Sequence, residues 1–146
     1  MTNPVISFVV IGRNEGERLT RCLESIGEIR GVEGEVDVIY VDSASTDDSV
    51  QRAQAEGARV LEVRPERPSA ALGRNAGWKE ALAPFILFLD GDTILHPDFP
   101  AQALAAMQDP SVAVVWGHRR EIQTGTSVFN RVLDLDWIYP AGLSEF

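Results

Sequence analysis

Residues 85–92, which read Phe85-Ile86-Leu87-Phe88-Leu89-Asp90-Gly91-Asp92, are the most informative segment of this chain. An apolar run followed at once by two carboxylates indicates a buried strand that delivers its acids to the carboxyl edge of a sheet, where open α/β sheets bind ligands. Two such acids can hold Mg²⁺ or Mn²⁺ against a diphosphate, because oxygen ligands suit both ions. Asp and Gly are also ordinary turn residues, so the tripeptide fits a plain strand exit equally well.

Strand and helix patterns alternate along the rest of the chain. Apolar and β-branched runs predict further strands at residues 5–11, 36–41, 59–63 and 112–116. Apolar residues at helical spacing and capping residues predict helices at 19–29, after 45–48 as far as 56, at 69–82, from 96–98 to 107, and at 127–138. This alternation implies an α/β fold with a mostly parallel central sheet and helices on both faces. Residues 118–123 also fit an edge strand, and residues 139–146 fit a loop.

The composition limits the classes of function. A chain of 146 residues with 45% hydrophobic content suits one domain and is too short for two ordinary ones. A formal net charge of -9 argues against an electrostatic grip on nucleic acid or on an anionic membrane surface. The single cysteine, Cys22, excludes an internal disulfide and a cysteine-rich zinc site. No segment reaches roughly 18 uninterrupted apolar residues and no export signal is evident, so we expect a cytoplasmic protein without a transmembrane segment.

Polar side chains collect after three of the predicted strands, in residues 12–15, 42–47 and 90–92. Because the carboxyl ends of parallel strands lie at the same edge of a sheet, we expect these segments to meet there. For Asp42, a turn and a ligand contact are both open. For Ser45, Thr46 and Asp47, capping of the following helix is the alternative to ligand contact, and we favour capping for the last two.

Four blocks of the sequence, taken in order, resemble the inverting family 2 glycosyltransferases of GT-A fold. They are residues 6–19, Val41-Asp42-Ser43-Ala44-Ser45-Thr46-Asp47, Gly73-Arg74-Asn75-Ala76-Gly77, and residues 87–92 followed by Pro97-Asp98. The resemblance implies a Rossmann-like GT-A domain over residues 1–146. Residues 1–117 would form its nucleotide-sugar-binding half, and residues 118–146 would begin an acceptor-side region that is incomplete at the C-terminus.

The resemblance implies substrate-binding roles on the nucleoside side for five residues: Arg13, Asn14, Glu15, Asp42 and Ser45. The first three lie in a segment that flanks the base and ribose in the family, where an aromatic residue usually stands in place of Arg13. The other two belong to a run that reads Asp-Asp-Gly-Ser-Thr in the family. Here Ser43 and Ala44 replace its second acid and its glycine.

The resemblance also implies a diphosphate and metal site. Arg74 matches the arginine of the family's Ala-Arg-Asn-x-Gly motif, near the diphosphate, with Gly73 in place of the alanine. Asp90 and Asp92 match the family's Asp-x-Asp pair. Asp92 would be the direct ligand of Mg²⁺ or Mn²⁺, and Asp90 would lie nearer the ribose or sugar while contributing to the metal site.

The implied function is transfer of a sugar from a UDP- or GDP-type donor to an unknown acceptor, with the metal stabilising the leaving diphosphate. The catalytic base stays unassigned, because Glu121, Asp134, Asp136 and Glu145 are better explained as surface acids. A non-catalytic nucleotide-binding module or an inactive fragment is the main alternative. A phosphate-accepting receiver domain is disfavoured, since Lys79 lies in a helical stretch, and a nucleotidyltransferase would need a more glycine-rich loop than residues 12–16. The apolar surface of an incomplete domain would favour self-association.

Overall fold

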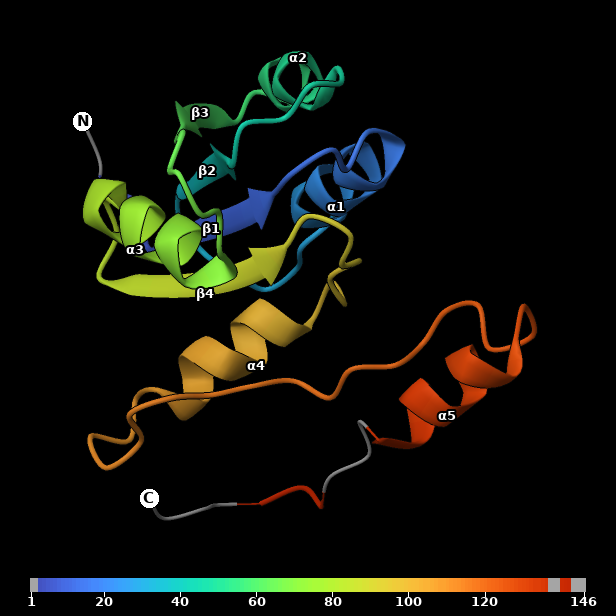
Figure 1. The fold of residues 1–146 in the computed structure, drawn as a ribbon. Coiled ribbons are helices and arrows are strands. Elements are labelled where there is room, and N and C mark those ends of the chain that lie inside the picture. The colour runs from blue at the N-terminus through green and yellow to red at the C-terminus, as the bar shows by residue number, and fades with distance from the viewer. Residues whose placement is uncertain (1–2, 137–139, 143–146) are drawn as a thin grey trace.

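The computed structural model describes residues 3–136 and 140–142, and a four-stranded parallel sheet forms its centre (Figure 1). The strands lie in the order β3-β2-β1-β4, with the bounds β1 Ile6–Gly12, β2 Val36–Asp42, β3 Arg59–Glu62 and β4 Phe85–Asp90. Gly12 lies opposite Asp42 and Ile11 lies opposite Asp90, so the carboxyl ends of β1, β2 and β4 reach the same edge. The predicted α/β fold with a parallel sheet is confirmed.

Helices cover both faces of the sheet (Figure 1). α1 (Glu17–Gly27) and α2 (Ser49–Ala55) lie on one face and α3 (Ala70–Glu80) lies on the other. Because successive strand side chains point to opposite faces, Phe8, Val10 and Tyr40 pack toward α1 and α2, while Val9 and Val41 pack toward α3. α4 (Phe99–Ala106) joins the cluster on the first face, and α5 (Val128–Asp136) follows farther along the chain.

α3 lies unusually close to the sheet because two glycines face it. A Cβ atom at Gly77 would lie 2.3 Å from Cγ1 of Val9 and 2.9 Å from Cγ2 of Val41. One turn earlier, a Cβ atom at Gly73 would lie 3.2 Å from Cγ2 of Ile11. The backbone of α3 therefore rests directly on the side chains of β1 and β2.

An ion pair between Asp37 and Arg59 joins β2 to β3 at the other edge of the sheet, where the strands begin. Asp37, which is 8% exposed, accepts hydrogen bonds from Nε and Nη2 of Arg59 at 2.9 and 3.0 Å and from Oγ of Ser7 at 2.8 Å. The Ser7 hydroxyl oxygen also accepts from the amides of Leu82 and Ala83, both at 3.1 Å. Burial acts to raise the pKa of Asp37, but the hydrogen bonds from Arg59, Ser7 and Leu82 outweigh it and lower that pKa. The network ties three strands to the segment that follows α3.

Residues 112–116, predicted to form a fifth strand, and residues 118–123, which also fitted an edge strand, form neither. They run as an extended connection past α4 (Figure 1), where a Cβ atom at Gly117 would lie 3.0 Å from the ring of Phe99. Val114, Trp116 and Ile122 are 61%, 51% and 69% exposed. A strand needs a hydrogen-bonded neighbour, and in the described part of the chain no strand pairs with this segment.

α5 confirms the predicted helix at residues 127–138 as far as the described residues reach, from Val128 to Asp136. Ile138 and most of the predicted loop at 139–146 lie outside the described residues, while residues 140–142 are neither helix nor strand. The apolar side chains of α5 are largely exposed, with Phe129 at 81%. None of the described helices is long and apolar enough to span a lipid bilayer.

Asp134 is not the surface acid that we predicted. It is 9% exposed and accepts hydrogen bonds from Nε and Nη2 of Arg120 at 2.8 and 2.9 Å and from the amide of Glu121 at 2.9 Å. α5 is thereby tied to the segment that precedes it. The side chain of Asp136 and all of Glu145 lie outside the described residues.

Candidate functional site

Three loops meet at the carboxyl edge of the sheet, as predicted. They follow β1, β2 and β4 and span residues 13–16, 43–48 and 91–98. The amide of Ser43 donates to the carbonyl of Gly12 at 3.0 Å, and the amide of Gly91 donates to the carbonyl of Ile11 at 2.8 Å. The side chain of Glu15 in the first loop packs between the end of β1 and the third loop, because Cβ atoms on Gly12 and Gly91 would lie 2.9 and 3.1 Å from its Cγ.

The first two loops hold each other through hydrogen bonds. The amide of Asn14 donates to Oγ of Ser45 at 2.9 Å, and Oδ1 of Asn14 accepts from the amide of Thr46 at 2.7 Å. Asn14 has a φ of 56°, a left-handed conformation in which asparagine is enriched. The buried hydroxyl of Ser49 accepts from two successive amides of the first loop at 3.1 and 3.0 Å. Each loop is therefore shaped by the other.

The capping prediction is wrong for both Thr46 and Asp47, because Asp48 is the N-cap residue of α2 and no side-chain cap hydrogen bond forms at that residue. Oδ1 of Asp47 accepts from the amide of Ser49, the first residue of α2, at 3.0 Å. Thr46 directs its amide and its hydroxyl to Asn14 instead, at 2.7 and 3.4 Å. The hydroxyl of Ser45 is likewise used between the loops and not at the helix end.

Asp42 stabilises the second loop from its buried side, through a hydrogen bond to the backbone of that loop. It is 1% exposed, its Oδ1 accepts from the hydroxyl of Tyr40 at 3.0 Å, and its Oδ2 accepts from the amide of Ser45 at 2.8 Å. Burial, followed by the charge of Asp42, raises the pKa of Tyr40, so the phenol stays protonated and can donate. Asp42 is thus a turn-holding residue, and its contact with a nucleoside stays a prediction.

The third loop brings Asp90 against Arg74. Nη2 of Arg74 lies 2.6 Å from Oδ1 of Asp90, and each side chain is 37% exposed. Arg74 reaches this position because the glycines on either side of it seat α3 on the sheet. Asp92 is exposed at the turn, and within the described residues it has no hydrogen-bonded partner.

Burial and neighbouring charges raise the pKa values of two groups at this edge, Glu15 and Cys22. Burial raises the pKa of Glu15; the charge of Arg18 opposes this, and the charge of Asp92 adds to it. Oε2 of Glu15 lies 2.8 Å from Nη2 of Arg18, but among the described residues no donor is aligned for a hydrogen bond with that oxygen. Burial, with the charges of Asp92, Asp90 and Glu15, raises the pKa of Cys22 to about 12. Cys22 is therefore a neutral, buried thiol.

Asp90 and Asp92 offer the donor set for a metal shared with a ligand. Within the described residues, no three His, Cys, Asp or Glu side chains gather in a way that could hold an ion. Mg²⁺ is usually bound by one or two carboxylates together with substrate phosphates, and Mn²⁺ favours the same oxygen ligands. Two neighbouring, accessible carboxylates fit that arrangement.

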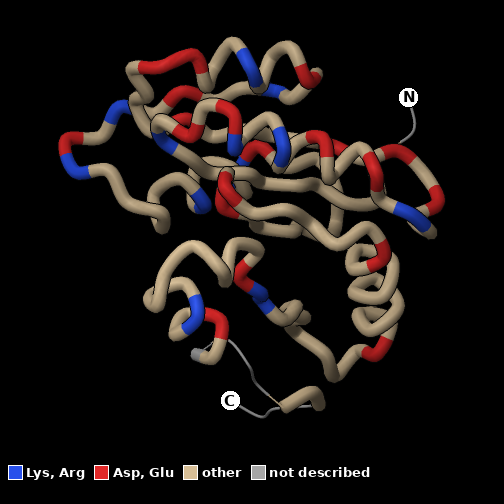
Figure 2. The backbone as a smooth tube through the Cα atoms, turned by 90° about the vertical axis from the view of Figure 1, so that its right-hand side faces the viewer, with Lys and Arg blue, Asp and Glu red and all other residues tan. Residues whose placement is uncertain are grey.

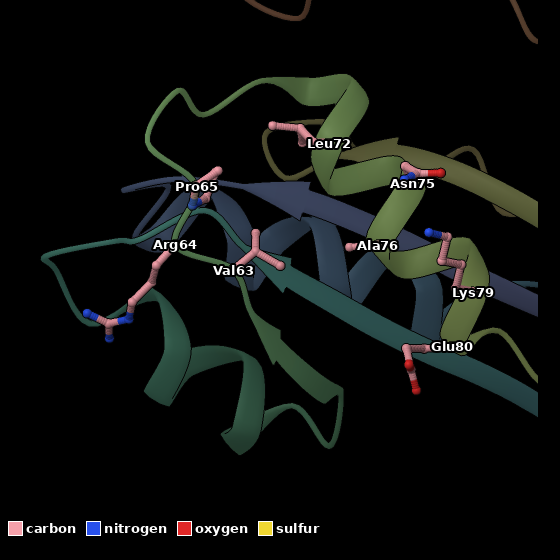
Figure 3. A pocket seen from close by; sticks show the side chains of 8 residues that line it. All are labelled: Val63, Arg64, Pro65, Leu72, Asn75, Ala76, Lys79 and Glu80. Carbon is pink, nitrogen blue, oxygen red and sulfur yellow. The ribbon is translucent and has the colours of Figure 1, made fainter.

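A groove of about 520 Å³ lies beside this edge, between the end of β3 and α3 (Figure 3). Its lining consists of Val63, Arg64, Pro65, Leu72, Asn75, Ala76, Lys79 and Glu80. None of the predicted site residues lines it. The spacing of Leu72, Ala76 and Lys79 along α3 is the one sequence signal that such a surface existed.

Acidic and basic residues are interspersed along the described chain (Figure 2). Arg13 is exposed, and within the described part of the chain its side chain makes no hydrogen bond or ion pair. The predicted site residues differ in how far they are already engaged: Glu15 faces Arg18, and Arg74 is paired with Asp90. Asn14, Asp42 and Ser45 are engaged in holding the loops, whereas Arg13 and Asp92 are open to a ligand.

The chain matches known proteins over most of its length. The model of the family described as Glycosyl transferase family 2 matches residues 7–143. Glucosyl-3-phosphoglycerate synthase of Mycobacterium tuberculosis is 37% identical over an alignment of 102 residues, which covers 64% of this chain and 31% of that protein. Glycosyltransferase AglE of Haloferax volcanii is 23% identical over 122 residues, covering 80% of this chain and 40% of that protein. The chain thus spans less than half the length of these curated relatives.

Solved structures share its fold. The structure of the Mycobacterium tuberculosis glucosyl-3-phosphoglycerate synthase in complex with UDP has a TM-score of 0.61 and is 31% identical, covering 73% of this chain and 40% of that one. A mannosyltransferase from Pyrobaculum calidifontis in complex with GDP-Man and Mn²⁺ has a TM-score of 0.66 at 24% identity, covering 77% of this chain and 34% of that one. The second likeness shows the fold alone, and together they confirm the GT-A architecture. The match over residues 7–143 shows that the chain belongs to glycosyl transferase family 2.

Proposed function

We propose that the carboxyl edge of the sheet binds a UDP- or GDP-type nucleotide sugar together with Mg²⁺ or Mn²⁺, and that the protein transfers the sugar to an acceptor. The observation that carries this proposal is the Asp90-Gly91-Asp92 turn, with Asp90 in contact with Arg74 at that edge. Carboxylates for a metal and a guanidinium for phosphate stand side by side there.

The donor class is supported by similar proteins. The Mycobacterium tuberculosis synthase, whose structure with Mn²⁺, UDP and glucosyl-3-phosphoglycerate is 29% identical to this chain, contains a uridine nucleotide and a divalent metal. The mannosyltransferase of the same fold contains GDP-Man and Mn²⁺. Both nucleotides carry a diphosphate whose charge a metal can neutralise, which is the chemical feature we carry over to this chain.

On the nucleoside side, we assign contacts to Arg13, Asn14 and Glu15 and to the loop that begins with Asp42 and Ser45. The two loops already fix each other by hydrogen bonds, so a nucleoside would meet a prearranged surface. The exposed guanidinium of Arg13 can stack on a base, as arginine does on aromatic rings, in the place of the family's aromatic residue.

On the diphosphate side, Asp92 and Asp90 would hold the metal. When bound, such an ion stabilises the negative charge that develops on the leaving diphosphate. Arg74 would add charge-assisted hydrogen bonds to the same group, and its position on a helix packed against the sheet limits how far it must reorganise.

We assign donor binding, and not proton removal from the acceptor, to the described residues. A general base needs a pKa near the working pH. The Arg120 guanidinium lowers the pKa of Asp134 to about 2, which makes that acid a poor proton acceptor. Binding of a nucleotide sugar without turnover would favour the non-catalytic alternative.

Calorimetric titration with UDP and GDP, each with and without Mn²⁺, tests the proposal. We expect tighter binding with Mn²⁺ for at least one of them, and loss of that metal dependence in Asp92→Asn. Asp109→Asn is the matched control, because Asp109 is an exposed aspartate in a turn after α4. If neither nucleotide binds more tightly with Mn²⁺, or if Asp92→Asn keeps the dependence, the site is wrongly assigned.

A further inference from the structure

The carboxylate of Asp90 is already paired with a positively charged group of the protein itself, the guanidinium of Arg74. Nη2 of Arg74 lies 2.6 Å from Oδ1 of Asp90, the same carboxylate that the proposed function gives to a metal. Both side chains are 37% exposed, so the pair lies at the surface of the site, within reach of a ligand. Among the described residues, Nη2 is the only guanidinium nitrogen of Arg74 with a hydrogen-bonded partner, which leaves its other donors available.

A divalent ion and this guanidinium compete for one carboxylate. The hydrogen bond occupies Oδ1 of Asp90, and the positive charge of Arg74 repels a second cation placed beside it. In the described part of the chain, no group of three acidic, His or Cys side chains could compensate by surrounding the ion. A metal arriving alone would meet the exposed Asp92 and an acid that is already paired.

We propose that Arg74 acts as a built-in counter-cation that makes metal binding depend on the diphosphate. A diphosphate offers acceptor oxygens to the guanidinium, which releases Asp90 to the metal, and it adds oxygen ligands to that metal. The inference rests on the proposed function, because it takes Asp90 and Asp92 as the metal ligands. Linkage makes the effect reciprocal, so the metal must strengthen nucleotide binding by the same factor.

The geometry of α3 suits this role. Gly73 and Gly77 seat the helix on β1 and β2, so the backbone at Arg74 has little freedom to move. The long side chain can turn between Asp90 and a phosphate without any displacement of the helix. A residue held in this way shifts the balance between two partners without changing the fold.

Metal binding without nucleotide gives the test. The electron paramagnetic resonance signal of free aqueous Mn²⁺ measures how much metal each protein removes from solution. In Arg74→Gln we expect Mn²⁺ alone to bind about fivefold more tightly than in the wild type, as expected for an exposed ion pair whose competition is removed. In the same variant we expect UDP, at saturating Mn²⁺, to bind roughly tenfold more weakly.

Controls separate this effect from a change in net charge or in folding. Arg21→Gln removes an exposed arginine that is paired with Glu17 on α1, and it should leave Mn²⁺ binding unchanged. In the double variant Arg74→Gln with Asp90→Asn, the gain should disappear because the freed carboxylate is absent. Circular dichroism confirms that each variant is folded, and Arg74→Lys, which keeps the charge, should bind Mn²⁺ as weakly as the wild type.

If Arg74→Gln binds Mn²⁺ alone no more tightly than the wild type, the counter-cation role is overturned. That outcome differs from failure of the proposed function, which would show as wild-type protein that binds neither UDP nor GDP more tightly with Mn²⁺. The comparison with Mn²⁺ alone decides the role of Arg74 in either case, because it uses no nucleotide.

Discussion

Gly77→Ala tests whether the close packing of α3 against the sheet contributes to the stability of the protein. The added Cβ would lie 2.3 Å from Cγ1 of Val9 and 2.9 Å from Cγ2 of Val41. Both valines are fully buried in neighbouring strands and are stiff at χ1, so neither methyl group can turn away cheaply. To restore ordinary contact, α3 must move outward by about 1 Å or the strands must separate.

The cost follows from two opposing effects. Overpacking of this kind costs about 1–3 kcal/mol, and the short contact with Val9 places Gly77→Ala at the upper end. Alanine in a helix interior recovers about 1 kcal/mol relative to glycine. We therefore expect a net loss of about 2 kcal/mol in the free energy of unfolding, which lowers Tm by about 5–8 °C in a chain of this size.

Thermal and urea unfolding, followed by circular dichroism, measure this loss. Gly73→Ala is the matched control, because its Cβ would lie 3.2 Å from Cγ2 of Ile11 and needs a much smaller adjustment. The gain in helix propensity should keep that variant within about 2 °C of the wild type. A Gly77→Ala protein that melts with Gly73→Ala or above it would refute the packing of α3 described here.

Three further predictions concern polar contacts. Asp37→Asn should lower the free energy of unfolding by about 1–3 kcal/mol. Because Arg59 and its other donors lower the pKa of Asp37, this difference should be full above the unfolded pKa of about 3.9 and vanish in stronger acid, as Tm measured against pH will show. Asp134→Asn should speed hydrogen exchange at the amide of Glu121. The pKa of Asp134 is lowered to about 2, so the difference from the wild type should be present above pH 4 and close as the pH falls through about 2. Ser49→Ala should cost about 1–3 kcal/mol, because two loop amides lose their buried acceptor, and should weaken UDP binding in calorimetry.

The four paired strands were predictable, because burial on both faces produces continuous apolar runs. Residues 112–116 carry the same kind of run and yet form no strand. Strand formation depends on a neighbour that completes the hydrogen bonds, and local composition carries no information about that neighbour. The same limit explains Asp134, whose burial depends on an arginine fourteen residues earlier in the chain.

The meeting of three loops at one edge was also predictable, because parallel strands end together. The hydrogen bonds within the loops were not. A signal existed for Asp42, since Tyr40 stands two residues earlier in the same strand and two-residue spacing places both side chains on one face. For Ser49 no such signal existed, because a serine at a helix start is ordinarily read as part of the cap.

The hydrogen bonds around Asp42 also explain how this chain accommodates alanine where the family has glycine. Ala44 has a φ of 60°, a conformation that costs a residue with a Cβ about 1–2 kcal/mol. The residue on each side is held in place, because the amide of Ser43 donates to Gly12 at 3.0 Å and the amide of Ser45 donates to Asp42 at 2.8 Å. Two such bonds are sufficient to offset a cost of this size. The shape of the loop is therefore imposed by the buried carboxylate below it, and glycine is not required to produce it.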